Sequence, residues 1–198
     1  MTFIDTVPTG EATGAVAELY EADRADDGYV WNNTQAFSHR PEVYSGWNQF
    51  LRKIVGNMDS RRYELATLAA ARRLRSSYCM LAHGSLMLRE NLIEPDELRA
   101  VATDHRSAGL APAEVAVMDL ADKVAADATS VTQADIDGLR AHGLSDPEIL
   151  DVVLAAAARC FMSKVIDAVG AQPDHAYEAR LEPALRDALV VGRPIAAS

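Results

Sequence analysis

The stretch RRYELATLAAARRLRSSYCMLAHGSLMLRE, residues 61–90, points most directly to a fold and to a chemistry. It contains Cys79, one of only two cysteines, and His83 follows four residues later. In a helix these two side chains share a face, about 6 Å apart along the axis at a rise of ~1.5 Å per residue. Glu64 and Ser76 precede the cysteine. The stretch therefore gathers a thiol, an imidazole, a carboxylate and a hydroxyl that can cap a helix.

This spacing predicts an activated thiol. If Ser76 is the N-cap of a helix, Cys79 is its third residue, close to the unpaired N–H groups and the positive end of the helix dipole. Such surroundings favour the thiolate, which is the reactive form of cysteine. His83 could accept or relay the proton, and Glu64 could orient the imidazole. These are the parts of a nucleophilic site: nucleophile, base and orienting group.

Plainer interpretations of the same residues stay open. A cysteine on an amphipathic helix is often a small buried hydrophobic residue. If residues 61–75 form one straight helix, Glu64 lies about 16 Å along the axis from its end. The carboxylate then reaches Cys79 only if the helix stops early and folds back, or if another subunit supplies the contact.

A metal site is a further alternative for Cys79 and His83, because cysteine and histidine one turn apart can supply half of one. The other four histidines stand singly along the chain, at positions 39, 105, 142 and 175. The second half of the site is therefore missing, and we expect neither a metal nor another cofactor.

The composition indicates one soluble globular domain. Of the 198 residues, 49% are hydrophobic and 24% are charged. We expect a single helical domain over residues 1–198, with a core at about 40–173, an N-terminal arm at 1–11 and a C-terminal tail at 190–198. A net charge of −10 disfavours nucleic acid and anionic membranes as partners.

The sequence patterns that bear on location, and the small number of cysteines, also agree with a soluble globular domain. No apolar run approaches the ~18 residues that a membrane span needs, and the N-terminus lacks the pattern of a secretory signal. Two distant cysteines do not make a disulfide framework. We therefore expect a cytoplasmic, reduced protein.

The hydrophobic pattern is helical throughout, and no β-alternating stretch is flanked by hairpin turns. We predict an all-α fold of about eight or nine helices. One is a long helix after the capping box at Ser145, with Ile149, Val152, Val153, Ala156, Cys160 and Lys164 along one side. The helices are expected to begin near residues 14, 41, 60, 76, 94, 112, 132, 145 and 175.

The arrangement of Glu64, Ser76, Cys79 and His83 resembles the signature of the carboxymuconolactone decarboxylase and alkylhydroperoxidase D superfamily. In its peroxidase branch, a glutamate precedes a Cys-x-x-Cys pair, and a histidine follows four residues after the second cysteine. The flanking patterns R-x-x-E-L and Y-C-x-x-x-H-G are also similar, as is the text from DLADKV at 119–124 onward. The resemblance covers about residues 40–173.

This resemblance implies a multi-helical alkylhydroperoxidase D-like bundle that assembles as a homo-oligomer, a trimer or a dimer of trimers. It implies that Cys79 is the peroxidatic cysteine of an antioxidant peroxidase, with His83 and Glu64 as the proton relay. Attack of the thiolate on a small hydroperoxide would leave a sulfenic acid. An external thiol would then be the reductant.

Ser76 departs from the peroxidase pattern, because it stands where that branch has the first cysteine of the pair. The usual intrachain disulfide is impossible, unless the fold brings Cys160 close. The decarboxylase branch commonly lacks the pair and keeps a histidine at position 83, so an enzyme for a small carboxylated lactone is an alternative. Cationic anchors for it would be nearest at Arg72, Arg73 and Arg75. A non-catalytic oligomeric member of the superfamily is the third possibility.

Overall fold

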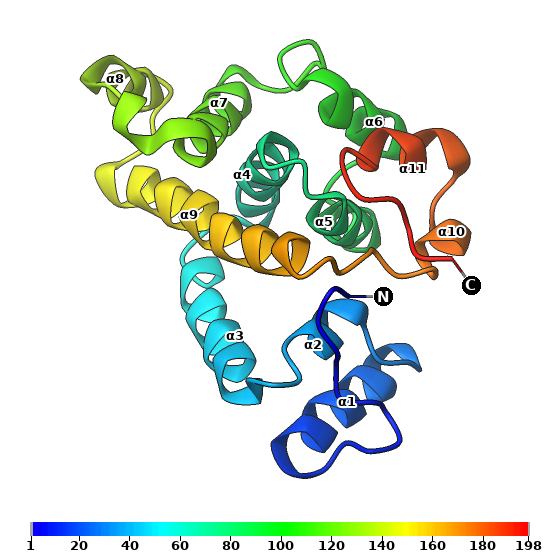
Figure 1. Ribbon diagram of the computed structural model, residues 1–198. Coiled ribbons are helices and arrows are strands. Elements are labelled where there is room, and N and C mark those ends of the chain that lie inside the picture. The colour runs from blue at the N-terminus through cyan, green and yellow to red at the C-terminus, as the bar shows by residue number, and fades with distance from the viewer. Residues whose placement is uncertain (1, 198) are drawn as a thin grey trace.

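Residues 2–197 are described by a computed structural model, and within them all regular secondary structure is helical, without a strand (Figure 1). This confirms the predicted all-α class, and nine of the eleven α-helices have seven or more residues. The elements are α1 (Gly14–Asp27), α2 (Asn32–Ala36), α3 (Pro41–Val55), α4 (Ser60–Arg73), α5 (Ser77–Arg89), α6 (Pro95–Asp104), α7 (Pro112–Asp127), the 3-10 turn η1 (Ala128–Ser130), α8 (Gln133–Ala141), α9 (Asp146–Ala168), α10 (Tyr177–Arg180) and α11 (Pro183–Leu189).

Helix α4 is the centre of the fold, and it packs against α5, α7 and α9 (Figure 1). Every residue from 63 to 71 is buried. The alanines of this segment let neighbouring helices approach closely on several sides. The Asp59 carboxylate caps the helix, since its Oδ1 accepts a hydrogen bond from the Arg62 amide at 2.9 Å.

A tight reversal joins α4 to α5. Arg75 has φ of 57°, in the left-handed region that few non-glycine residues occupy. The amide of Ser76 donates to the Ala71 carbonyl at 2.9 Å, and α5 begins one residue later. Helix α4 therefore ends early and the chain folds back, which places residues from both helices on a shared interface.

The long helix α9 crosses both α4 and α7 and also contacts α3. Its capping box is present, because the Glu148 carboxylate accepts hydrogen bonds from the amide and hydroxyl of Ser145 at 2.9 and 2.7 Å. The stripe predicted for its inward side was wrong in its last two members. Cys160 is only partly buried and Lys164 is exposed, whereas Arg159 and Ser163 are buried.

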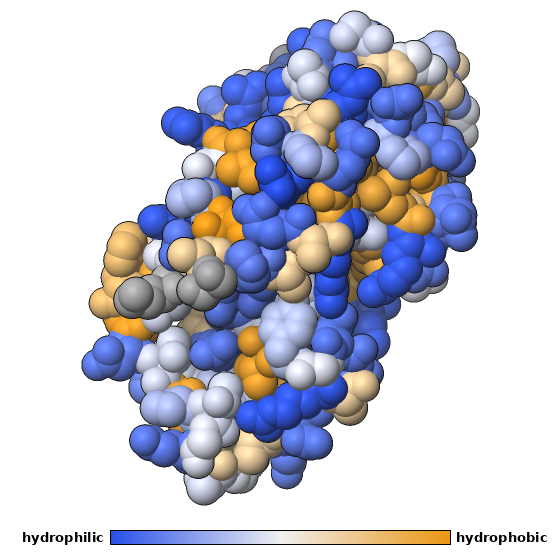
Figure 2. Space-filling model, turned by 90° about the vertical axis from the view of Figure 1, so that its right-hand side faces the viewer, coloured by the Kyte–Doolittle hydropathy of each residue, from blue (hydrophilic) through white to orange (hydrophobic). Residues whose placement is uncertain are grey.

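The C-terminal region differs from the single helix predicted near residues 175–189. It forms the short helices α10 and α11, separated at Leu181 and Glu182. Pro183 explains the break, because proline has no N–H to donate and disfavours a helical residue before it. Figure 2 shows the side of the molecule that lies to the right in Figure 1, where these helices are, with hydrophobic residues in small separate groups among hydrophilic ones.

The predicted tail lies against the α4–α5 turn. The Gly192 amide donates to the Ser77 hydroxyl at 2.7 Å, and Arg75 Nε donates to the Val191 carbonyl at 3.2 Å. A Cβ at position 192 would come within 2.0 Å of the Arg75 carbonyl oxygen, so the close approach requires glycine. The predicted arm and tail include Met1 and Ser198, which lie outside the described residues, and the single-domain boundaries stay a prediction.

No helix between residues 2 and 197 combines the length and apolar character that crossing a membrane requires.

Candidate functional site

Cys79 is the third residue of α5, as predicted, and only 2% of its surface is exposed. Its sulfur accepts two hydrogen bonds from α9: one from the Ser163 hydroxyl at 3.2 Å and one from Arg159 Nη1 at 3.4 Å. The two donors are four residues apart and therefore lie on the same helix face. We call Arg159, Ser163 and the first turn of α5 the thiol cradle.

Arg159 is a buried cation, with 4% of its surface exposed. Among residues 2–197 it forms no ion pair with a carboxylate, and its Nε has no hydrogen-bond partner. Burial disfavours its charge, but the nearby Cys79 sulfur and Tyr63 hydroxyl together raise the pKa of the guanidinium above its usual value. The Cys79 sulfur is therefore the group best placed to carry a balancing negative charge.

His83 and Glu64 form a second pair across the α4–α5 hairpin. The distance from His83 Nδ1 to Glu64 Oε2 is 2.6 Å, and both side chains are largely buried. Helix α4 runs to Arg73 before the chain folds back, and the contact forms within one chain. The partner of Glu64 is the histidine, and no hydrogen bond joins Glu64 to Cys79 in the described part of the chain.

The protonation of His83 follows from its surroundings. Burial lowers the pKa of the imidazole, the positive charge of Arg159 lowers it further, and Glu64 opposes both effects. A neutral ring that donates its Nδ1 proton to Glu64 leaves Nε2 as an acceptor. His83 is thus arranged to take a proton at Nε2.

Ser76 occupies the predicted N-cap position, and its carbonyl accepts from the Met80 amide at 3.0 Å. The prediction that its hydroxyl caps the helix was wrong, because no side-chain capping bond forms. The hydroxyl that donates to the thiol belongs to Ser163 instead.

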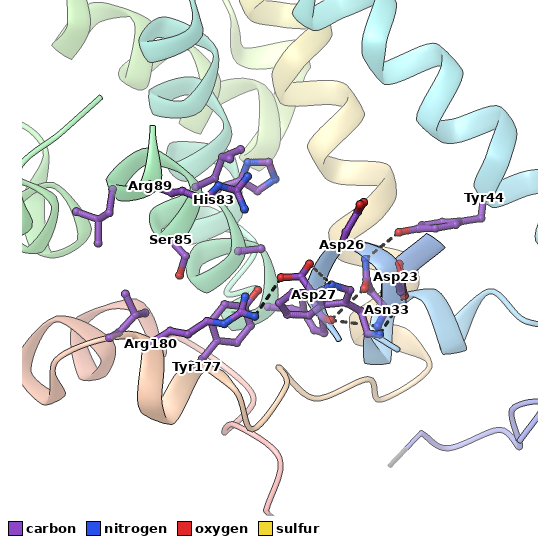
Figure 3. Close-up of a pocket in the computed structure, with 16 residues that line it drawn as sticks. Asp23, Asp26, Asp27, Asn33, Tyr44, His83, Ser85, Arg89, Tyr177 and Arg180 are labelled. Atoms are coloured by element: carbon purple, nitrogen blue, oxygen red, sulfur yellow. Dashed lines mark hydrogen bonds and ion pairs between the residues drawn. The ribbon is translucent and has the colours of Figure 1, made fainter. Parts of the chain in front are cut away.

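A cavity of about 790 Å³ opens beside this helix (Figure 3). His83 and Tyr78 line it from α5, and Trp31 and Asn33 line it from the segment after α1. Cys79 itself is not in the lining, so the thiol lies behind this wall. The lining residues are Asp23, Asp26, Asp27, Trp31, Asn33, Tyr44, Tyr78, Ala82, His83, Ser85, Leu86, Leu88, Arg89, Tyr177, Arg180 and Leu181.

Cys160 lies apart from this site. It follows Arg159 directly, so its side chain projects about 100° around the helix from the one that contacts Cys79. It is free and partly buried, and burial raises the pKa of its thiol. The chain therefore does not bring Cys160 to Cys79 as a resolving partner.

The three arginines considered as anchors for a carboxylated lactone do not line the cavity. Arg72 donates to the Thr103 carbonyl, and Arg73 Nε donates to Asp122 Oδ1 at 2.8 Å. Arg75 Nε donates to the Val191 carbonyl in the C-terminal tail. The cations that do line the cavity are Arg89 and Arg180.

Arg159 and Ser163 were missed from the sequence, although a signal for them exists. Val152, Ala156, Arg159, Ser163 and Ile166 recur at steps of four and three, and all five are buried. An arginine in the phase of an apolar helix face indicates a buried charge with a partner. The partner, 80 positions away, is not visible in a local pattern.

Among residues 2–197, no group of three or more histidine, cysteine, aspartate or glutamate side chains is arranged to hold a metal ion.

A model of the carboxymuconolactone decarboxylase family matches residues 41–123. The superfamily resemblance predicted from the sequence is thereby confirmed. The matched residues of this chain include Glu64, Ser76, Cys79 and His83. The match ends before Arg159 and Ser163. The search of curated proteins found no match to the chain.

Solved structures share the fold along most of the chain. One is an alkylhydroperoxidase AhpD core, an uncharacterized peroxidase-related protein from Ralstonia eutropha JMP134, with a TM-score of 0.79 and 21% identity over 89% of this chain and 94% of that chain. Another is an uncharacterized peroxidase-related protein from Silicibacter sp. TM1040, with a TM-score of 0.73 and 20% identity over 88% and 90%.

The debrominase Bmp8 in its apo form is also similar, with a TM-score of 0.71 and 13% identity over 93% of this chain and 96% of that chain. At these identities the likeness establishes the fold alone.

Proposed function

We propose that the chain is a thiol-dependent hydroperoxide reductase in which Cys79 is the nucleophile. The observation that carries the proposal is the pair of hydrogen bonds to the Cys79 sulfur from the buried Arg159 guanidinium and the Ser163 hydroxyl. A cation and a hydroxyl donor stabilise a thiolate more than a thiol. A cysteine that served only as a hydrophobic residue would not need a buried arginine.

The proposed reaction uses His83 first as a base and then as an acid. Nε2 takes the proton of the Cys79 thiol, and the thiolate attacks the outer oxygen of the hydroperoxide. The S–O bond forms as the O–O bond breaks, so the sulfur is oxidised to a sulfenic acid and an alkoxide leaves. The alkoxide takes the proton from His83 and departs as the alcohol.

The return step needs an external thiol, because the position of the resolving cysteine is Ser76 and Cys160 points elsewhere. One thiol attacks the sulfenic acid, releasing water and forming a mixed disulfide with Cys79. A second thiol displaces it, restores the Cys79 thiol and leaves as the oxidised disulfide. A reducing cytoplasm, the proposed location, supplies such thiols.

Intact-protein mass spectrometry after a limited dose of hydroperoxide tests the proposal. We expect one added oxygen on Cys79, trapped by a sulfenic-acid reagent, and consumption of peroxide with dithiothreitol as the reductant. Cys79→Ser should lose both, while Cys160→Ser keeps both. Peroxide consumption that persists in Cys79→Ser would refute the proposal.

The decarboxylase alternative is favoured by one observation, the hydrogen-bonded His83–Glu64 pair, whose histidine lines the cavity. In that reaction His83 would be essential and Cys79→Ser would be mild. The non-catalytic alternative predicted a buried Cys79 with no cavity beside it. Cys79 is buried, but residues on either side of it, Tyr78 and His83, line a cavity, which supports a catalytic role.

The expected homo-oligomer also stays a proposal. An apolar groove of about 430 Å³ lies between α3 and α9, and Phe50 and Phe161 beside it are 50% and 42% exposed. Protruding rings and a groove on one face allow two copies to pack against each other. We propose a second copy of the chain as its occupant, and the trimer or hexamer rests on the family resemblance.

A further inference from the structure

The cavity beside His83 is far larger than a small peroxide requires. Its volume is about 790 Å³, whereas a water molecule occupies ~30 Å³ of liquid. Four aromatic side chains contribute to its walls: Trp31, Tyr44, Tyr78 and Tyr177. Cavities of this size with aromatic walls are typical of sites for organic ligands. The substrate is therefore expected to carry a flat apolar group.

The wall that contains Trp31 is acidic, and two of its carboxylates form no ion pair in the described part of the chain. Asp23, Asp26 and Asp27 line the cavity from the end of α1 (Figure 3). Only Asp27 forms an ion pair within residues 2–197, with Arg180 at 3.1 Å. Asp23 accepts a hydrogen bond from the Trp31 amide at 3.0 Å, and burial raises the pKa of its carboxyl. Asp26, which is exposed and forms no ion pair within residues 2–197, therefore leaves an uncompensated negative charge on this wall, whereas burial disfavours the charged form of Asp23.

The two arginines of the cavity do not offset this charge. The Arg180 guanidinium is already held by Asp27 and lies 5.0 Å from the centroid of the Trp31 ring. The Arg89 side chain is 69% exposed and pairs with Glu90 at 3.3 Å. A carboxylate entering the cavity would meet the acidic wall without a free cation to bind it.

We propose that this cavity selects uncharged substrates with an aromatic or similarly flat group and rejects carboxylates. That these substrates are hydroperoxides rests on the proposed function; the charge preference of the cavity does not. This charge preference also distinguishes the chain from an enzyme for a carboxylated lactone, whose binding cavity would need positive charge.

The first test compares kcat/KM for cumene hydroperoxide with that for its para-carboxylate. We expect the uncharged substrate to be preferred at least tenfold at pH 7.5. Asp26→Asn should raise the ratio of kcat/KM for the carboxylate to kcat/KM for the uncharged substrate about fivefold, which is the effect of one charge at a partly screened distance. Asp151→Asn on α9 removes the same charge away from the cavity and is the matched control. Equal rates for the two substrates would overturn the proposal.

The second test separates this inference from the proposed reaction. It uses Cys79→Ser, which cannot form a sulfenic acid at position 79, and it measures binding alone. Calorimetry gives the affinities of this variant for two unreactive alcohols, 2-phenyl-2-propanol and its para-carboxylate. We expect the uncharged alcohol to bind at least tenfold more tightly, and Asp26→Asn to narrow the difference. If this holds while no hydroperoxide is reduced by the unaltered chain, the reaction is wrong and the selection stands. No binding of the uncharged alcohol, or equal binding, overturns the selection.

Discussion

The two cysteines of the chain have opposite surroundings, although Cys160 follows a residue that contacts Cys79. Cys79 is enclosed at the start of a helix, where its sulfur accepts hydrogen bonds from Arg159 and Ser163. Cys160 is half-buried on a helix side, and burial raises the pKa of its thiol. Under the proposed function, the neighbours of each thiol, rather than the thiol itself, determine which cysteine reacts. Each prediction below changes one of these neighbours.

Removing the cation of the thiol cradle should have the largest effect. Arg159→Met is expected to lower the rate of Cys79 oxidation by hydroperoxide about 100-fold, because a hydrogen bond to a charged group contributes up to about 3 kcal/mol. Stopped-flow oxidation in a Cys160→Ser background measures this rate.

The fold should survive this change, since methionine fills a similar volume and removes a buried charge that has no carboxylate partner. The melting temperature of Arg159→Met is therefore expected to be equal or higher, which excludes unfolding as the cause. Arg159→Lys keeps a charge and should recover part of the rate. Unchanged oxidation in Arg159→Met would mean that the guanidinium does not activate Cys79.

Neutralising the acid behind His83 should have the next largest effect. Glu64→Gln keeps an acceptor for the Nδ1 proton but removes the charge that raises the pKa of His83. We expect kcat/KM to fall about 30-fold, less than the roughly 10²–10⁴-fold attributed to the general acid–base group itself, because Glu64 acts through His83. Rates measured across pH provide the second readout.

The pH profile has a defined sign. In the unaltered chain the pKa of His83 lies below its usual value of 6.5, so the neutral base is already present at that pH and is lost only as the pH falls through the lowered pKa. In Glu64→Gln that acidic limb should move to still lower pH, and in Arg159→Met to higher pH. A limb that does not move in either variant would exclude His83 as the titrating group.

Removing the hydroxyl of the thiol cradle should have a smaller effect. Ser163→Ala is expected to slow Cys79 oxidation about tenfold, since a hydrogen bond to a charged group contributes about 1.5 kcal/mol. The same stopped-flow measurement applies. Ser76→Ala, which removes a buried hydroxyl that makes no capping bond, is the matched control and should change the rate less than Ser163→Ala. The reverse order would place the thiolate donor at Ser76.

The sequence predicted what depends on local periodicity. The helix containing Cys79, its N-cap at Ser76 and the all-α class follow from patterns within one or two turns. The meeting of Glu64 with His83 depends on a reversal at Arg75, a residue type that rarely adopts the left-handed conformation the turn requires. No glycine or asparagine stands at position 75 to indicate this turn from the sequence.

Long-range packing could not be predicted in the same way. The contact of Arg159 with Cys79 depends on how α9 crosses α5, and the predicted stripe through Cys160 and Lys164 placed the wrong face inward. On an alanine-rich helix several faces are apolar, so hydrophobic periodicity does not define the buried one. Arg159, a charged residue at the spacing of the buried apolar residues, indicated the inward face more reliably.

Changing the second cysteine should have the smallest effect. Cys160→Ser is expected to alter peroxide turnover with an external thiol by less than about twofold, because its side chain lies about 100° around α9 from the thiol cradle. The substitution nearly preserves volume at a partly exposed position, so stability should change by no more than ~0.5 kcal/mol. A slower return of oxidised Cys79 to the thiol in Cys160→Ser, measured at several protein concentrations, would contradict this. If that slowing grew with concentration, Cys160 of another copy would be the resolving thiol, and the contrast between the two cysteines would hold within one chain only.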